Sequence, residues 1–190
     1  MSEDGGVLIE HGFWTPEACA RIRRAMDRGR MEAAEVYEEG FAVSAARRSF
    51  DVDVDQTTLA WIDRALLPAR ALAGDFFSLD LRASEGAGLL RYPPGGFYGP
   101  HRDVLPRAAG DWQRHISLVI FLNSSGNEAG DGGSFGGGEL RLYRDVPDHE
   151  QNLLVIVPRC GTLVAFPARC LHEVLPVTRG TRDAVVDWFA

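Results

Sequence analysis

Short apolar or alternating runs dominate the chain from Phe77 onward. Clusters of Gly, Pro, Asn and Asp separate these runs at spacings typical of a β-sandwich or β-barrel. The runs that predict strands are Gly88–Tyr92, His115–Leu122, Glu139–Tyr143, Leu153–Val157, Gly161–Phe166, His172–Val177 and Arg182–Phe189. Because His115–Leu122 is almost continuously apolar, it predicts a central strand that is covered on both faces.

The N-terminal part of the chain has helical periodicity instead. Thr15 can cap a helix that begins at Pro16 and stops at Gly29. A second periodic run, from Leu59 to Phe76, predicts another helix with a kink or break at Pro68. Between the two helices, the mixed and polar stretch 31–55 predicts weak strands at best.

Helices followed by antiparallel strands predict a mainly β protein, a jelly roll with helical support. We expect a single domain over residues 1–190, with the helical support in about 1–76 and the jelly-roll core in about 77–190. The chain of 190 residues is long enough to bury a core of its own.

Composition narrows the class of partner. A net charge of -7 and a pI near 5.2 argue against nucleic acid or an anionic membrane as partner, because both require basic surface. The acidic start at Met1–Asp4 and the lack of a long apolar run predict a soluble, cytoplasmic protein. The three cysteines favour reduced thiols, although a pair between Cys160 and Cys170 remains open.

The most informative pattern is His101-Arg102-Asp103, followed far downstream by His172. Alternation along a strand would place His101 and Asp103 on the same face. Two imidazoles and one carboxylate on one face of a metal form the facial triad of non-haem Fe(II) sites, which leaves coordination positions open. The other histidines fit surface or strand-edge positions, so His172 is the third candidate ligand; they are His11, His115 and His149.

Arg182 follows His172 on the returning strand of a predicted hairpin. There it shares a face with small and apolar residues and with Trp188, which indicates an inward-facing arginine. A buried arginine requires an anion, and a dicarboxylate could supply it through paired N–H···O bonds. The alternative is a surface arginine in an ordinary hairpin.

Several motifs in order resemble the prolyl 4-hydroxylase-like branch of the Fe(II)/2-oxoglutarate oxygenases. The residues that carry this resemblance are Arg91-Tyr92, Phe97-Tyr98-Gly99-Pro100-His101-Arg102-Asp103, Gly137-Gly138-Glu139-Leu140, His172-Glu173-Val174-Leu175-Pro176-Val177, Gly180-Thr181-Arg182 and Trp188. The resemblance implies that His101, Asp103 and His172 bind the iron. It implies that Arg182 and Tyr92 hold 2-oxoglutarate, and that Tyr98 and Trp188 lie near the pocket.

The resemblance also implies a double-stranded β-helix, the cupin-like form of the jelly roll. It implies Fe(II), 2-oxoglutarate and O2 as cofactors, with ascorbate as a supporting reductant. The reaction would hydroxylate an unactivated C–H bond and release succinate and CO2. The substrate that it favours is a prolyl residue in a peptide or protein, and the alternatives are a free amino acid or a small natural-product precursor.

Two segments are expected to decide the substrate, namely Met31–Asp55 and the loop Pro93–Tyr98. We expect them to form a mobile lid over the pocket. Arg47 and Arg48 could receive an acidic group of the substrate, or could be a solvated surface pair.

Other functions fit less well. The letters His101-Arg102-Asp103 also occur in protein kinases, but Ala108 stands where the kinase catalytic loop needs Asn. A cupin-like metal protein without oxygenase activity and a non-catalytic binding module remain open. Arg182 and Tyr92 favour the oxygenase, because a plain metal cupin has no use for a dicarboxylate clamp.

Overall fold

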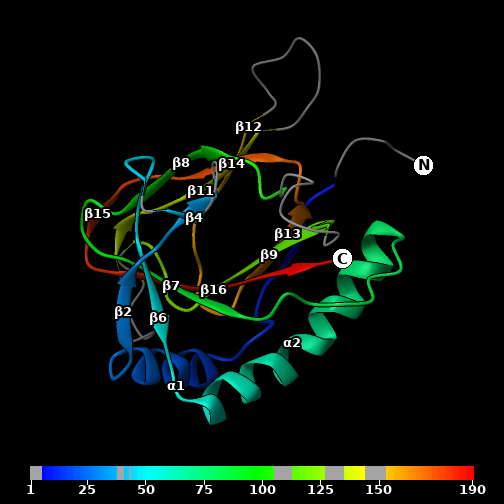
Figure 1. The fold of residues 1–190 in the computed structure, drawn as a ribbon, viewed down its shortest axis with the longest axis horizontal. Coiled ribbons are helices and arrows are strands. Elements are labelled where there is room, and N and C mark those ends of the chain that lie inside the picture. The colour runs from blue at the N-terminus through cyan, green and yellow to red at the C-terminus, as the bar shows by residue number, and fades with distance from the viewer. Residues whose placement is uncertain (1–5, 38–40, 43, 105–112, 127–134, 144–152) are drawn as a thin grey trace.

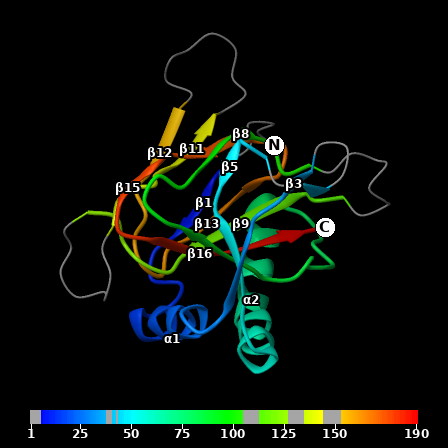
Figure 2. The ribbon, with the colours of Figure 1, turned by 60° about the vertical axis from the view of Figure 1, so that its left-hand side comes forward.

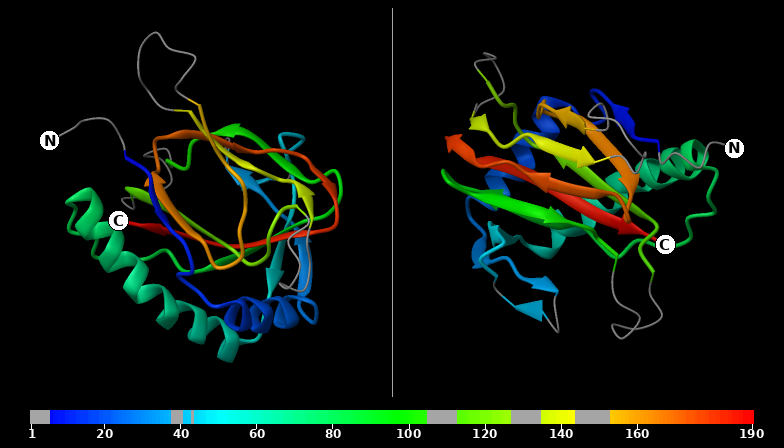
Figure 3. Two further views of the ribbon diagram at one scale, coloured as in Figure 1. Left: turned by 180° about the vertical axis from the view of Figure 1, so that it is seen from behind. Right: turned by 90° about the horizontal axis from the view of Figure 1, so that it is seen from above.

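The computed structural model describes residues 6–37, 41–42, 44–104, 113–126, 135–143 and 153–190. Two antiparallel β-sheets face each other, and two helices cover the outer face of the larger sheet (Figure 1). The turned views keep the same order of layers: helices, larger sheet, smaller sheet (Figure 2, Figure 3). Each sheet therefore buries an apolar face against its neighbour.

The strands of the described residues form a seven-stranded and a five-stranded sheet. The larger sheet, in spatial order, consists of β1 (Leu8–Glu10), β13 (Leu163–Pro167), β9 (Ile116–Phe121), β16 (Arg182–Phe189), β7 (Gly88–Tyr92), β6 (Phe50–Asp53) and β2 (Arg30–Ala33). The smaller sheet consists of β12 (Leu153–Ile156), β11 (Leu140–Tyr143), β14 (Leu171–Val174), β8 (Phe97–His101) and β5 (Arg47–Arg48). Two short pairs are β10 (Gly136–Gly137) with β15 (Val177–Arg179), and β3 (Val36–Tyr37) with β4 (Phe41–Ala42).

Strand β9 is buried on both faces, which confirms the prediction from its continuous apolar sequence. Leu118 and Ile120 pack against the helices, in a cluster that includes Ile22 and Ile62. Their neighbour Phe121 faces the other way, into the space between the two sheets. The apolar run therefore serves two cores, one on each side of the larger sheet.

The first helix, α1 (Pro16–Met26), begins where the sequence predicted. The Thr15 hydroxyl accepts a hydrogen bond from the N–H of Ala18 at 3.3 Å. The predicted stop at Gly29 is wrong by a few residues, because the helix ends at Met26. Gly29 is needed for a different reason: a Cβ there would lie 2.2 Å from the backbone oxygen of Asp53.

The second helix, α2 (Gln56–Phe77), runs through Pro68. Of the predicted kink or break at Pro68, the break is therefore wrong, and the kink stays a prediction. A proline inside a helix costs about 3 kcal/mol, and the burial of Leu66 and Ala69 on either side of it offsets that cost. The apolar face of the helix packs against the larger sheet, so tertiary contacts hold its two halves together.

The described residues of the stretch 31–55 form short strands. Strands β2 and β6 pair with each other, and β6 pairs with β7, so both extend the larger sheet. Strand β5 pairs with β8 at the edge of the smaller sheet. These strands are two to four residues long, which agrees with the prediction of weak strands at best, and pairing with other strands holds them in place.

Strand β16 alternates as predicted. Ala184 and Val186 pack between the sheets, whereas Val185 packs toward the helices. Arg182 lies on the inward face of this strand and is 2% exposed, while Asp183 is fully buried on the opposite face. The alternative of a surface arginine at position 182 is therefore wrong.

None of the three cysteines, all of which the structure describes, is disulfide-bonded, so the open alternative of a Cys160–Cys170 disulfide is not realised. The Cys160 thiol lies 3.4 Å from the carbonyl of Leu122, and the Cys170 thiol lies 3.5 Å from the carbonyl of Tyr143.

No helix in the described part of the chain has the length and hydropathy needed to cross a membrane.

Candidate functional site

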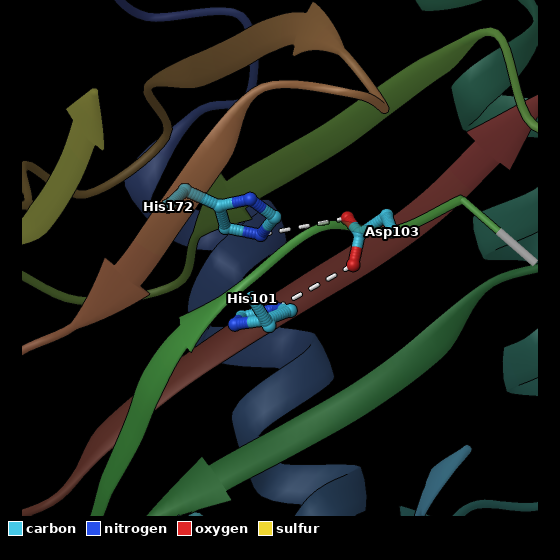
Figure 4. A group of neighbouring side chains, drawn as sticks. All are labelled: His101, Asp103 and His172. Carbon is cyan, nitrogen blue, oxygen red and sulfur yellow. Dashed lines mark ion pairs between the residues drawn. The ribbon is translucent and has the colours of Figure 1, made fainter. Parts of the chain in front are cut away.

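The two histidines of the predicted triad face each other on neighbouring strands. His101 ends β8 and pairs directly with His172 of β14, with ring centroids 4.1 Å apart. Asp103 points toward both rings (Figure 4), but it lies beyond the end of β8. The expected strand alternation is therefore wrong for Asp103, whose N–H instead donates to the carbonyl of Ala168 at 2.9 Å.

The histidine rings are held so that the same nitrogen of each faces the carboxylate. His101 Nδ1 lies 2.8 Å from the carbonyl of Gly99, and His172 Nδ1 lies 3.0 Å from that of Cys170. A carbonyl can only accept, so each Nδ1 carries the proton and each Nε2 is left as a ligand. Both Nε2 atoms lie 3.5 Å from an Asp103 oxygen, and the ligand atoms of the three residues all lie within 4.8 Å of one another. This arrangement can hold one metal ion.

The protonation states also suit a metal. Burial raises the pKa of Asp103, but the two histidines and a hydrogen bond from Ser117 outweigh it and lower the pKa overall. Burial lowers the pKa of His172, although Asp103 opposes this. An ionised carboxylate and a neutral imidazole are the forms that coordinate a metal. The Ser117 hydroxyl donates to Asp103 Oδ2 at 2.7 Å and so orients the carboxylate.

The buried side chain of Arg182 is the second feature of the candidate site. Its guanidinium carbon lies 4.9 Å from the ring centroid of Tyr92 and 5.2 Å from that of Phe121, and Nε donates to the carbonyl of Gly138 at 3.0 Å. Burial lowers the pKa of Arg182, while Tyr92 and Asp183 oppose that shift. Within the described residues no carboxylate forms an ion pair with Arg182, so a fixed cation faces the cavity without a counter-ion.

One cavity of about 160 Å³ contains both features. The predicted site residues that line it are Arg47, Tyr92, Tyr98, His101, Asp103, His172, Arg182 and Trp188. Arg48 does not line the cavity, and its guanidinium lies against Gly95 instead. The structure therefore brings together every predicted site residue except Arg48.

The comparison with protein families agrees with this geometry. The family model described as the 2OG-Fe(II) oxygenase superfamily matches residues 87–190, which is more than half of the chain. This chain belongs to the 2OG-Fe(II) oxygenase superfamily. Membership implies Fe(II), 2-oxoglutarate and O2, and the His–Asp–His triad and the buried Arg182 fit the first two of these groups.

Curated relatives of this oxygenase carry the name PKHD-type hydroxylase. One from Klebsiella pneumoniae is 34% identical over 149 residues, which is 76% of this chain and 61% of the relative. One from Escherichia coli is 29% identical over 181 residues, covering 93% of this chain and 75% of the relative. The match with the Klebsiella protein thus spans less than two thirds of its length.

Solved structures confirm the fold. The crystal structure of a Pseudomonas putida prolyl-4-hydroxylase has a TM-score of 0.67 at 24% identity, covering 97% of this chain and 92% of that one. A Trichoplax adhaerens prolyl hydroxylase, solved with a peptide fragment of hypoxia inducible factor, has a TM-score of 0.74 at 19% identity, covering 97% of this chain and 83% of that one. The predicted double-stranded β-helix and the resemblance to prolyl 4-hydroxylases are both confirmed.

Two residues of the site were not predicted from the sequence. Ser117 orients Asp103, and Arg114 donates from Nη1 to the Asp103 carbonyl at 3.3 Å. Arg114 also pairs with Glu85 and lies 3.8 Å above the Trp188 ring. The sequence contained a signal for a role of Ser117, because it is the only polar residue in the otherwise apolar strand β9. Arg114 lies just before that strand and has no local signal.

The predicted lid segments are partly anchored in the structure. Gly95 donates its N–H to the carbonyl of Val177 at 2.7 Å, and Val177 donates to the carbonyl of Gly96 at 2.9 Å. Arg47 and Arg48 pair with β8. A lid movement of Pro93–Tyr98 would have to break these bonds, so the lid stays a prediction.

Proposed function

We propose that this chain is an Fe(II)- and 2-oxoglutarate-dependent hydroxylase that acts on a prolyl residue of a peptide or protein. The observation that carries the proposal is the pairing, in one cavity, of a His–Asp–His triad with a buried arginine that no acid neutralises among the described residues. When bound, the iron and 2-oxoglutarate would use O2 to hydroxylate a C–H bond, with release of succinate and CO2.

His101, Asp103 and His172 would hold the iron from one side. The hydrogen bonds from the Nδ1 atoms to backbone carbonyls keep both rings in the orientation that a metal needs. Ser117 does the same for the carboxylate. These contacts set the site before a metal arrives, so little reorganisation is needed on binding.

Arg182 would bind the carboxylate of 2-oxoglutarate that lies away from the iron. Two aromatic rings and the Gly138 carbonyl fix the guanidinium, which leaves its terminal nitrogens to form paired bonds with a carboxylate. The apolar surroundings, which include Leu140 and Val186, keep water away from this charge pair.

Aromatic groups favour a prolyl substrate. The Tyr98 ring stacks on His101 with centroids 3.4 Å apart, so it places an aromatic ring that lines the cavity beside a metal ligand. Trp188 lines the same cavity, and its buried Nε1 has no hydrogen-bond partner among the described residues. A buried donor without a partner is costly, and the carbonyl of a peptide could accept from it. The named structural relatives, a prolyl-4-hydroxylase and a prolyl hydroxylase with a bound peptide, support the same substrate class.

The test is succinate formation with Fe(II), 2-oxoglutarate, O2 and ascorbate, and with a panel of prolyl peptides, free amino acids and small natural-product precursors. We expect a prolyl peptide to stimulate succinate release and to gain one oxygen atom by mass spectrometry. Hydroxylation of a free amino acid alone would favour that substrate class instead. If no 2-oxoglutarate were consumed under any condition, a cupin-like metal protein without oxygenase activity would be the better reading.

Replacing Arg182 with Gln is expected to raise the KM for 2-oxoglutarate about 10- to 150-fold, since a hydrogen bond to a charged group contributes about 1.5–3 kcal/mol. The affinity for iron should stay the same, because Arg182 contacts none of the three ligands through the hydrogen bonds described. Initial rates at varied 2-oxoglutarate, together with anaerobic iron titration, measure the two effects. An equal loss of iron affinity would contradict the assigned role.

A further inference from the structure

Arg47 lies outward of the metal ligands in a stack of three side chains. Strand β5 places Arg47 opposite Tyr98 of β8, and the guanidinium carbon lies 4.8 Å from the Tyr98 ring centroid. Tyr98 in turn stacks on His101. A substrate that rests against Tyr98 near the metal would therefore also meet Arg47.

Neutral groups hold the Arg47 side chain in place. Nε donates to the Ser49 hydroxyl at 2.8 Å, and Nη1 donates to the backbone carbonyl of Glu35 at 2.8 Å. Neither acceptor carries a charge, so the guanidinium is oriented but not neutralised. In the described parts of the chain, no ion pair reaches Arg47 and no hydrogen bond involves Nη2.

The other arginines that line the cavity are engaged elsewhere. Arg182 lies at the buried end of the cavity. Arg114 is paired with Glu85, and Arg102 is exposed and donates to the backbone carbonyl of Arg169. Arg47 is thus the cation best placed to meet a group near the bound substrate.

Acidic residues also surround Arg47, and their effect has to be weighed. Glu35 lines the cavity with Arg47, and Asp51 is near enough for Arg47 to lower its pKa. Burial nevertheless raises the pKa of Asp51 overall, and Glu35, Asp53 and Glu32 raise it further. Glu35 is exposed, so solvent and salt weaken the field of its carboxylate. These acids weaken the attraction of Arg47 for a distant anion, so the substrate carboxylate has to lie within hydrogen-bond distance of the guanidinium, where a charge-assisted hydrogen bond opposes them.

We propose that Arg47 selects substrates that carry a carboxylate next to the residue to be hydroxylated. Nη2 would donate a charge-assisted hydrogen bond to this carboxylate. The inference rests on the proposed hydroxylase function and names the substrate class for it. The carboxylate could come from an Asp or Glu side chain beside the proline of a peptide, or from the α-carboxylate of a free prolyl compound.

Matched substrate pairs test this. In the first pair, one peptide has Asp next to the proline and the other has Asn at the same position; the pair is made once with this residue before the proline and once with it after the proline. The second pair is free proline and prolinamide. Hydroxylation is followed by mass spectrometry for the wild type and for Arg47→Gln. Arg48→Gln is the matched control, because Arg48 is the neighbouring arginine but does not line the cavity.

We expect the wild type to prefer the acid member of one pair by about tenfold in kcat/KM, the factor that corresponds to about 1.4 kcal/mol. This preference should arise mainly in KM. Arg47→Gln should bring the acid-to-amide ratio close to one, while Arg48→Gln should keep the wild-type ratio. A preference in the peptide pair identifies an acidic peptide, and a preference in the free pair identifies an amino acid.

Two results overturn the inference while leaving the hydroxylase function in place. The first is hydroxylation of acid and amide members at equal kcat/KM by the wild type. The second is an acid preference that Arg47→Gln retains or that Arg48→Gln loses equally. If the wild type consumes 2-oxoglutarate but hydroxylates none of these prolyl compounds, the proposed prolyl function fails, and this inference fails with it.

Discussion

Replacing Asp103 with Ala is expected to abolish iron binding and, with it, substrate-dependent succinate formation. Asp103 supplies the negative charge of the triad, because imidazole coordinates a metal in its uncharged form. Losing a hydrogen-bond partner of a metal ligand already costs about 10- to 100-fold in affinity. Losing the ligand itself should cost more, so we expect at least about a 1,000-fold loss of activity at limiting iron, beyond the upper end of that range.

Anaerobic titration with Fe(II), or with Co(II) as a spectroscopic probe, measures the affinity directly. Ser117→Ala is an intermediate case, because it removes the hydrogen bond that orients Asp103 but leaves the carboxylate. It should weaken iron binding by about 10- to 100-fold. His115→Ala is the matched control, since His115 is exposed and lies outside the triad. Wild-type iron affinity in Asp103→Ala would refute the triad.

The sequence predicted the ligands better than it predicted their local structure. His101 was predicted from its spacing to Asp103, and His172 was predicted as the third ligand because histidine is scarce, with five in the chain. Asp103 was predicted from strand alternation, yet it lies past the strand end and a backbone bond to Ala168 positions it. The His-x-Asp spacing therefore identified both residues, although the strand assumed to hold them ends before Asp103.

Long-range pairing explains most of what the sequence could not predict. Strands β2 and β6 are short and polar, and they exist because β7 offers an edge to pair with. Helix α2 continues through Pro68 because buried contacts outweigh the local penalty. In both places tertiary context overrides propensity.

The sequence alone also could not distinguish the two neighbouring arginines near the rim of the cavity. Arg47 and Arg48 are identical neighbours in the sequence, and no local pattern separates them. Only the pairing of β5 with β8 shows that Arg47 lies over Tyr98 while Arg48 lies against Gly95. Residue type alone therefore identified two candidates, and the pairing of the strands reduces them to one.

The second large effect is expected from Asp183→Asn, which should destabilise the protein by about 3–5 kcal/mol, the cost of breaking a buried ion pair from one side. Asp183 is fully buried and pairs with Arg23 at 3.0 Å and with Arg91 at 2.8 Å. Its backbone N–H also donates to the Asn123 side chain at 3.0 Å. Without the carboxylate charge, two arginine side chains that are less than a fifth exposed lose their shared partner.

Unfolding in denaturant measures this loss as a shift of the midpoint at constant slope. Asp27→Asn is the matched control, because Asp27 pairs with the same Arg91 but is 64% exposed at its side chain. It should cost no more than about 1 kcal/mol, as exposed ion pairs do. Equal midpoints for Asp183→Asn and Asp27→Asn would show that the buried network does not stabilise the fold.

The ion pairs of Asp183 with Arg23 and Arg91 are also expected to affect the binding of 2-oxoglutarate. Asp183 lies opposite Arg91 across β16 and β7, and the next pair along the same two strands is Arg182 and Tyr92. The ion pairs on the outer face therefore fix the strand pair whose inner face carries the proposed carboxylate clamp. Under conditions where Asp183→Asn is still folded, we expect its KM for 2-oxoglutarate to rise while its iron affinity stays near that of the wild type. An unchanged KM, measured beside Asp27→Asn, would limit Asp183 to stabilising the fold.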